Sequence, residues 1–181
     1  MNITRQFVMP NKWTFQMKPV RELLDRLVGN GAGWIDPFSG ESERAEHSND
    51  FNPNRPSTRH CEAIEFVQGL AKDDWWSGVL FDPPYTPEQM KRSYTEIGTP
   101  KVPHEVTKRQ FADVKDCLSL LLPVGATVIC FGWNTAGFGK GRGFELKEVH
   151  ILNHGGRHND TLITVECKKP TSQTTFPYQS A

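Results

Sequence analysis

Short apolar runs alternate along this chain with segments whose apolar residues recur at the spacing of a helix. Residues 79–81 and 126–131 are such runs, each flanked by glycine or aspartate, and they predict buried strands. Residues 20–28 and 111–122 are amphipathic at helical spacing, and glycine or proline follows each of them. A parallel connection between strands needs a crossover long enough to hold a helix, so this alternation is typical of a mostly parallel sheet. The sequence therefore predicts an α/β fold.

Weaker patterns extend this sheet toward both ends of the chain. They predict strands at residues 34–35, 45–49, 144–152 and 161–167, and helices at 63–70 and 87–94. Only the turn at residues 153–160 separates the last two strands, so we expect them to pair as a C-terminal antiparallel hairpin. A chain of 181 residues suits one core, so we expect a single domain over residues 1–168 and a disordered polar tail over 169–181.

The composition excludes several classes of protein. Lys and Arg number 21 and Asp and Glu also number 21, so any nucleic-acid surface must be local. The four cysteines are scattered, which is typical of buried thiols in a reducing compartment rather than of a disulfide framework. No apolar stretch reaches the length that crosses a membrane. These features predict a soluble cytoplasmic protein without a membrane partner.

The most informative motif is Asp82-Pro83-Pro84-Tyr85, which directly follows the strand predicted at residues 79–81. The amino nitrogen of adenine is a poor nucleophile because its lone pair is delocalised into the ring. The Asp82 carboxylate and the Pro83 carbonyl can each accept one amino hydrogen, and Pro84 restrains that backbone. Tyr85 offers a flat face to an extruded base. The alternative is a structural turn in which Asp82 caps a helix and Tyr85 packs at the surface.

With this motif the chain resembles the DPPY-type class I methyltransferases, and among them the small adenine-specific DNA methyltransferases of bacteria and their phages. The resemblance runs over residues 11–166. It implies a Rossmann-like sheet, S-adenosylmethionine as the cofactor, and methyl transfer to the N6 amino group of adenine in DNA, with the base flipped into the site. For a phage-encoded chain, it implies the cytoplasm of the bacterial host. The catalytic residues would be Asp82, Pro83, Pro84 and Tyr85.

The resemblance also implies a cofactor site: Phe15, Lys18, Asp36, Pro37, Phe38, Gly40, Asp50, Glu62 and Asp82. In it, Asp50 would accept hydrogen bonds from the ribose hydroxyls, and Glu62 would face the adenine amino group. The sequence departs from the family pattern in three ways. Residues 36–40 resemble the family's motif I, which here carries the single glycine Gly40. Glu62 stands where aspartate is commoner, and only a short segment separates Gly40 from Asn49. The last departure predicts that the first helix of the fold is very short or missing.

Two flexible segments, residues 86–110 and 132–144, are candidates for contacting nucleic acid. The residues that we expect to do so are Lys91, Arg92, Trp133, Asn134, Lys140, Arg142 and Arg157. The basic ones would gather around one opening and contact phosphates, and Trp133 would pack against the target base or the cofactor. The alternatives are ordinary solvated charges and a core tryptophan at a strand end.

Other functions remain open at this level. His150, His154 and His158 surround the predicted hairpin, but no cysteine or carboxylate completes a known ligand spacing, so we expect no metal. The substrate could instead be an amino group on RNA or on cytosine. A catalytically silent protein that sequesters the cofactor as a decoy is the remaining alternative, and the complete DPPY motif argues against it.

Overall fold

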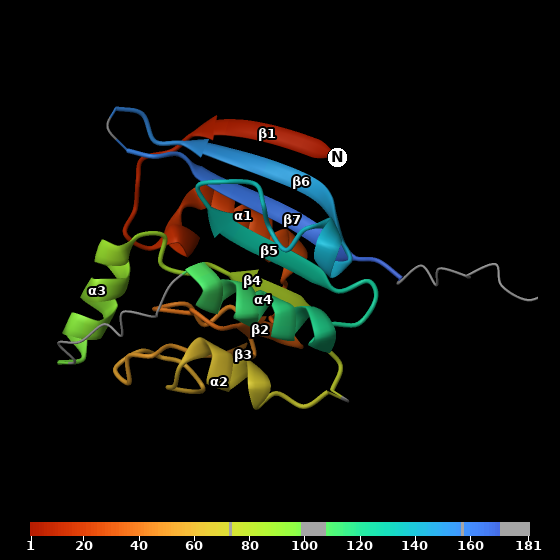
Figure 1. Cartoon of the computed structure of the whole chain (residues 1–181). Helices are drawn as coiled ribbons and strands as arrows, with labels where there is room; N and C mark the ends of the chain where they lie inside the picture. The colour runs from red at the N-terminus through yellow and green to blue at the C-terminus, as the bar shows by residue number, and fades with distance from the viewer. Residues whose placement is uncertain (73, 99–107, 157, 171–181) are drawn as a thin grey trace, which may run out of the picture.

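The computed structural model describes residues 1–72, 74–98, 108–156 and 158–170, which form a seven-stranded sheet between helices (Figure 1). The elements in chain order are β1 (Asn2–Phe7), η1 (Thr14–Gln16), α1 (Lys18–Leu27), β2 (Trp34–Asp36), β3 (His47–Ser48), α2 (Ala63–Gln68), β4 (Gly78–Phe81), α3 (Pro87–Glu96), α4 (Lys108–Leu121), β5 (Thr127–Gly132), η2 (Lys140–Arg142), β6 (Phe144–Asn153) and β7 (Thr161–Lys168). The strand order is β1-β6-β7-β5-β4-β2-β3, and β7 runs antiparallel to both of its neighbours. The α/β fold with its C-terminal antiparallel hairpin is thus confirmed.

Two apolar cores lie on the two faces of the sheet. Val79 and Phe81 of β4 point to the face that α2 and α4 cover, whereas Leu80 between them points to the face that α1 covers (Figure 1). All three are at most 2% exposed. Both faces of β4 are covered, which is why its sequence is a continuous apolar run and not an alternating one. Burying a side chain of this size stabilises the fold by about 1.5–3 kcal/mol.

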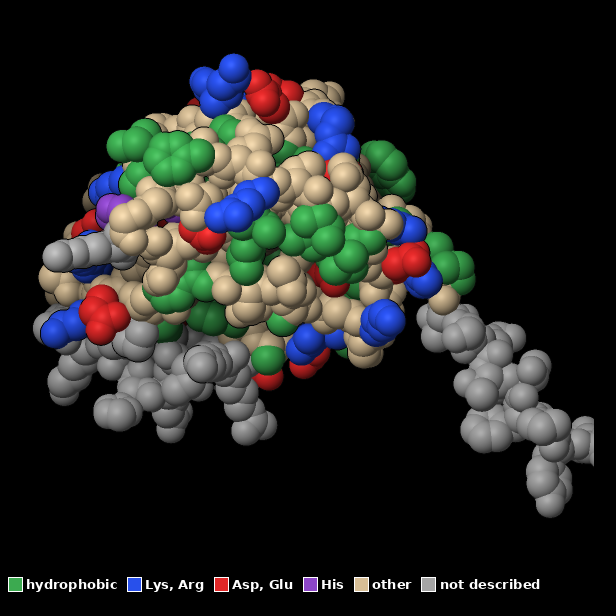
Figure 2. All heavy atoms as spheres, turned by 90° about the horizontal axis from the view of Figure 1, so that it is seen from above, with side chains coloured by type: hydrophobic (Ala, Val, Ile, Leu, Met, Phe, Trp, Pro, Cys, Tyr) green, Lys and Arg blue, Asp and Glu red, His purple; other side chains and the backbone are tan. Residues whose placement is uncertain are grey.

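Strand β1 is the element that the sequence analysis missed. It pairs in parallel with β6, from Asn2 beside Glu148 to Phe7 beside Asn153, and forms one edge of the sheet. Five of its six residues are exposed, so its sequence carries no apolar run that could reveal it. Figure 2 looks toward this edge and shows hydrophobic side chains scattered among charged ones. Within the described residues, no helix is long and apolar enough to span a membrane.

The turn between β2 and β3 replaces the first helix of the fold. Residues 37–46 contain no helix, as the short spacing between Gly40 and Asn49 predicts. Gly40 has a φ of 55°, and a Cβ built there would lie 3.5 Å from the ring of Trp13. Only glycine adopts this conformation without strain, so Gly40 lets the turn pass close beneath the N-terminal segment.

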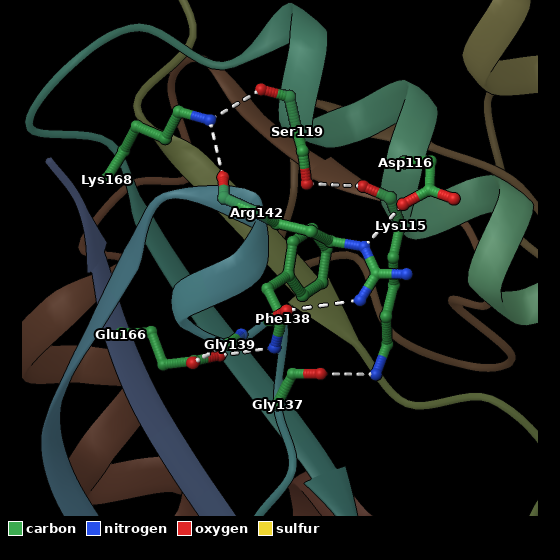
Figure 3. A network of polar contacts seen from close by, with 9 residues as sticks. All are labelled: Lys115, Asp116, Ser119, Gly137, Phe138, Gly139, Arg142, Glu166 and Lys168. Atoms are coloured by element: carbon green, nitrogen blue, oxygen red, sulfur yellow. Dashed lines mark hydrogen bonds and ion pairs between the residues drawn. The ribbon is translucent and has the colours of Figure 1, made fainter. Parts of the chain in front are cut away.

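The segment after β5 returns along the sheet to the other end of the strands, where the parallel strands begin. It leaves β5 at Gly132 and reaches η2, which lies beside the start of β6 and the end of β7. Glu166, which is 2% exposed, accepts hydrogen bonds from the backbone N–H groups of Phe138 at 2.6 Å and Gly139 at 2.9 Å. This carboxylate fixes the middle of the returning segment (Figure 3).

Further polar contacts fix the returning segment to α4 and β7. Lys115 donates to the Gly137 carbonyl at 2.6 Å, and Arg142 donates to Asp116 at 2.6 Å. Lys168 donates to the carbonyls of Ser119 and Arg142 at 2.8 and 2.9 Å (Figure 3). The loop that the sequence analysis expected to be flexible is therefore held by charged side chains along its second half.

Candidate active site

A cleft of about 1170 Å³ lies at the carboxyl ends of the parallel strands. Open α/β sheets bind their ligands at this end of their strands. The loops after β2, β3, β4 and β5 all contribute to it, together with the N-terminal segment and α3. It brings together most of the predicted site residues, namely Phe15, Pro37, Phe38, Gly40, Asp50, Glu62, Asp82, Pro83, Pro84, Tyr85, Arg92 and Trp133.

The DPPY turn forms one wall of the cleft, directly after β4. The Tyr85 hydroxyl donates a hydrogen bond to Asp82 Oδ1, and the Thr14 side chain also hydrogen-bonds the Asp82 carboxylate. Burial raises the pKa of Asp82 to about 6, although these two hydrogen bonds oppose the shift. The Trp133 ring lies 5.7 Å from that of Tyr85, centroid to centroid, at 47°. At the cleft, a carboxylate is thus bonded to the hydroxyl of one aromatic residue, and a second aromatic ring lies beside that residue.

A fully buried carboxylate, Asp36, lies close to the DPPY turn. Asp36 is fully buried at the end of β2, and its Oδ1 accepts a hydrogen bond from the Phe38 N–H at 3.1 Å. Its Oδ2 has no hydrogen-bond partner in the part of the chain that the structure describes. Burial above all raises the pKa of Asp36 well above its usual range, and the charges of Asp82 and Asp50 raise it further.

The position of Asp36 corrects one prediction. We expected it among the residues that contact the cofactor, yet it is fully buried and does not line the cleft. Its contact with the Phe38 N–H supports the motif I turn.

Asp50 follows β3 and lines the middle of the cleft. Its two carboxylate oxygens accept hydrogen bonds from the N–H groups of Gly40 at 3.0 Å and Asn52 at 2.8 Å. Burial raises the pKa of Asp50, and these hydrogen bonds oppose the shift. The contact with Gly40 ties the loop after β3 to the motif I turn, so both sides of the cleft floor are fixed relative to each other.

The next part of the cleft contains two aromatic residues that the sequence analysis missed, Phe51 and Tyr94. Tyr94 of α3 donates its hydroxyl hydrogen to Glu62 Oε1 at 2.9 Å. Its ring lies 4.8 Å from that of Phe51, centroid to centroid, at 52°. Phe51 could have been found from its place directly after Asp50. Tyr94 could not, because its partner Glu62 is 32 residues away in the sequence.

The N-terminal segment covers the motif I turn. The Trp13 ring lies over Gly40, and the guanidinium of Arg55 lies 5.2 Å from the centre of that ring. Arg55 also forms ion pairs with Glu41 and, at 2.8 Å, with Glu96 in the last turn of α3. Arg55 therefore links three walls of the cleft, and no local sequence pattern reveals this because each partner comes from a different loop or helix.

Several predicted nucleic-acid contacts lie away from the cleft. Lys140 and Arg142 lie at the opposite end of the strands, because the segment that carries them runs back along β5. The prediction that they gather with Lys91 and Arg92 around one opening is therefore wrong. Among these basic residues, the cleft is lined by Arg92, whereas Lys91 is exposed elsewhere on α3.

Three further predicted residues also lie outside the cleft lining or outside the described chain. Lys18 is exposed at the start of α1 and lies 3.8 Å from Glu22. The Asn134 side chain accepts a hydrogen bond from the Ala136 N–H in a local turn. Arg157 lies outside the described residues, as do residues 171–181, most of the expected tail.

Solved structures of known proteins resemble this arrangement, although no family model and no curated protein matches the sequence. TrmN from Thermus thermophilus aligns with a TM-score of 0.54 and 15% identity over 84% of this chain and 49% of that chain, so the present chain spans about half the length of TrmN. The 1,6-didemethyltoxoflavin-N1-methyltransferase of Burkholderia thailandensis, solved with 1,6-didemethyltoxoflavin and S-adenosylhomocysteine, aligns with a TM-score of 0.54 and 10% identity over 84% and 78% of the two chains. The chain has a Rossmann-like class I methyltransferase fold.

The histidines near the hairpin have structural contacts. His154 hydrogen-bonds the Val8 carbonyl at 2.9 Å and Thr161 at 2.8 Å, and His150 contacts Thr4 and Glu148. Over residues 1–72, 74–98, 108–156 and 158–170, no group of three or more His, Cys, Asp or Glu side chains is arranged to hold a metal ion.

Proposed function

We propose that this protein transfers a methyl group from S-adenosylmethionine to the N6 amino group of adenine in DNA. The observation that carries the proposal is the DPPY turn at the cleft. There the partly desolvated carboxylate of Asp82 lies beside the ring of Tyr85, and Trp133 faces that ring. A carboxylate acceptor next to aromatic faces is what an extruded base with an amino group requires.

The cleft residues fit S-adenosylmethionine. The cleft has a volume of about 1170 Å³, which exceeds that of typical small-molecule sites. Asp50 keeps acceptor capacity for ribose hydroxyls beyond the two N–H groups that it already accepts. Phe51 and Glu62 offer an aromatic face and an acceptor to the adenine end, and Gly40 leaves backbone room for the methionine end. When bound, the cofactor supplies an electrophilic methyl group.

The chain's own residues would activate the target nitrogen. Asp82 accepts one amino hydrogen and the Pro83 carbonyl accepts the other, which favours a pyramidal nitrogen with an available lone pair. With the cofactor bound, this lone pair would form the N–C bond to the methyl group, and the electron pair of the broken C–S bond would stay on sulfur. The nitrogen then has one proton too many, and the Asp82 carboxylate, with its pKa of about 6, is placed to accept that proton.

One incubation series tests the substrate. The protein is incubated with S-adenosylmethionine and, in turn, duplex DNA, single-stranded DNA and RNA, and the digested nucleosides are analysed by mass spectrometry. N6-methyladenine from DNA supports the proposal. Methylation of RNA alone, or of cytosine, overturns the substrate assignment but keeps the chemistry. Cofactor binding without any methylated product would indicate a silent, cofactor-sequestering protein instead.

A further inference from the structure

Tyr94 contacts the two residues that the proposed function assigns to the adenine end of the cofactor, Glu62 and Phe51. It is 8% exposed, its hydroxyl is bonded to Glu62 at 2.9 Å, and its ring lies 4.8 Å from that of Phe51. We propose that Tyr94 occupies the adenine position of the cofactor site, and that the cofactor must displace it before the catalytic turn can accept a base. This inference rests on the proposed function, because it assigns Phe51 and Glu62 to the adenine end.

The chemistry of the two groups is the same. Adenine presents a flat ring and N–H donors at its edge, and a tyrosine presents a flat ring and one O–H donor at its edge. Glu62 accepts the donor in either case, and Phe51 contacts the ring in either case. A third ring does not fit between Phe51 and Tyr94, because two stacking layers need about 7 Å and the two centroids are 4.8 Å apart. Adenine and Tyr94 therefore compete for one position.

Helix α3 connects Tyr94 to the catalytic turn. Helix α3 begins directly after the DPPY turn, and Thr86 starts it with a capping box. Within that box the Gln89 side chain accepts hydrogen bonds from the N–H groups of Tyr85 at 2.6 Å and Thr86 at 3.2 Å. A shift of α3 is thus transmitted to Tyr85, whose hydroxyl now caps the Asp82 carboxylate. Cofactor binding would free Asp82 for the substrate, so the cofactor binds first and the base second.

The test measures binding of S-adenosylhomocysteine by calorimetry to the full chain and to two variants. Tyr94→Phe removes the hydrogen bond to Glu62 and should bind about threefold to tenfold more tightly, because less of the protein is held in the occluded state. Tyr94→Ala also removes the ring and should bind more tightly still. Thr95→Ala, which removes a hydroxyl from the exposed side of the same helix, is the matched control and should bind like wild type.

Fragments make the test specific to the adenine position. Adenosine should show the same gain in affinity as S-adenosylhomocysteine in both Tyr94 variants, whereas methionine should show none. If both variants bind S-adenosylhomocysteine as wild type does, or more weakly, Tyr94 is a wall of the site and the inference is overturned. If neither wild type nor the variants bind it at all, the proposed function is overturned as well.

Discussion

Carboxylates lie near both ends of the parallel strands, but their partners differ. At the end opposite the cleft, Glu166 accepts hydrogen bonds from two backbone N–H groups within a segment that Lys115 and Arg142 also hold (Figure 3). At the cleft, Asp82 accepts from the side-chain hydroxyls of Tyr85 and Thr14. Backbone donors cannot rotate away, whereas side-chain hydroxyls can, so a ligand can replace the partners of Asp82 but not those of Glu166.

The difference separates a structural role from a chemical one. Burial raises the pKa of Asp82, Asp36 and Asp50, so the cleft holds acidic groups in an environment that disfavours their charge. Such clustering of perturbed acids is typical of functional sites. The charged groups at the opposite end of the strands bind the returning segment and lie away from the cleft. We therefore expect substitutions at the cleft to impair activity, and substitutions at the opposite end of the strands to impair stability.

The largest expected effect is on catalysis in Asp82→Ala. The substitution removes the acceptor of one amino hydrogen in a desolvated site, which should cost about 3–4 kcal/mol of transition-state stabilisation, or at least a hundredfold in rate. Asp82→Asn retains one acceptor oxygen and should lie between wild type and alanine. Single-turnover methylation of DNA measures the rates, and calorimetry with S-adenosylhomocysteine should show that both variants still bind the cofactor. A variant that methylates at a near wild-type rate would refute the role of Asp82.

The next largest effect should be on stability, in Glu166→Ala. It leaves the N–H groups of Phe138 and Gly139 without their buried acceptor, so the free energy of unfolding should fall by about 2–4 kcal/mol. Urea unfolding at pH 7 measures this. Glu145→Ala on the exposed surface of β6 is the control and should change little. Methylation per folded molecule should be unaffected. A specific loss of catalysis would contradict the structural role assigned to this end of the strands.

Much of the fold could be predicted because its strands carry their signal in their own residues. β4 and β5 are apolar on both faces, and α1 and α4 show helical periodicity. β1 could not be predicted, because an exposed edge strand needs no apolar residues and its partner β6 lies more than 140 positions away. The C-terminal hairpin was predictable because a single turn joins its two strands.

The candidate site could be predicted where a motif is contiguous, and not where loops meet. The DPPY turn, Asp50 and Gly40 follow strand ends, and strand ends of a parallel sheet meet at one edge. The contacts of Tyr94 with Glu62 and of Arg55 with Glu96 join distant segments, so no local pattern reveals them. Lys140 and Arg142 were misplaced because their charge is local information, whereas the direction of the loop that carries them depends on the buried Glu166.

The free energy of unfolding should depend on pH because the folded protein disfavours the ionised form of Asp82. Its pKa of about 6 in the folded protein lies above the ordinary value of 3.8, so the fold prefers the protonated form. Its contribution to stability is therefore present below about pH 4 and is lost as the pH rises through 6. Asp82→Asn, which stays neutral, should match wild type at pH 4 and exceed it at pH 8 by about 1–3 kcal/mol. Urea unfolding across this range measures the difference, and a constant difference would contradict the shift.

The smallest expected effect concerns salt. If DNA enters the cleft, Arg92 in the lining of the cleft is placed to contact a phosphate. Arg142 is instead paired with Asp116 at the opposite end of the strands. One lost phosphate contact lowers the slope of log affinity against log salt by about 0.9 on duplex DNA. Arg92→Ala should show this change, and Arg142→Ala should keep the wild-type slope. Fluorescence anisotropy with labelled duplex DNA between low and moderate salt measures both.

The paired variants make this last comparison decisive, because both remove one guanidinium and the same formal charge. A general effect of net charge would change both slopes equally, whereas a contact at the cleft changes one. Equal changes would therefore indicate a general effect of net charge, and the assignment of Arg92 to a phosphate contact at the cleft would be overturned. An unchanged slope in Arg92→Ala alone would place the phosphate path elsewhere on α3, where Lys91 is exposed, and Lys91→Ala would then show the change.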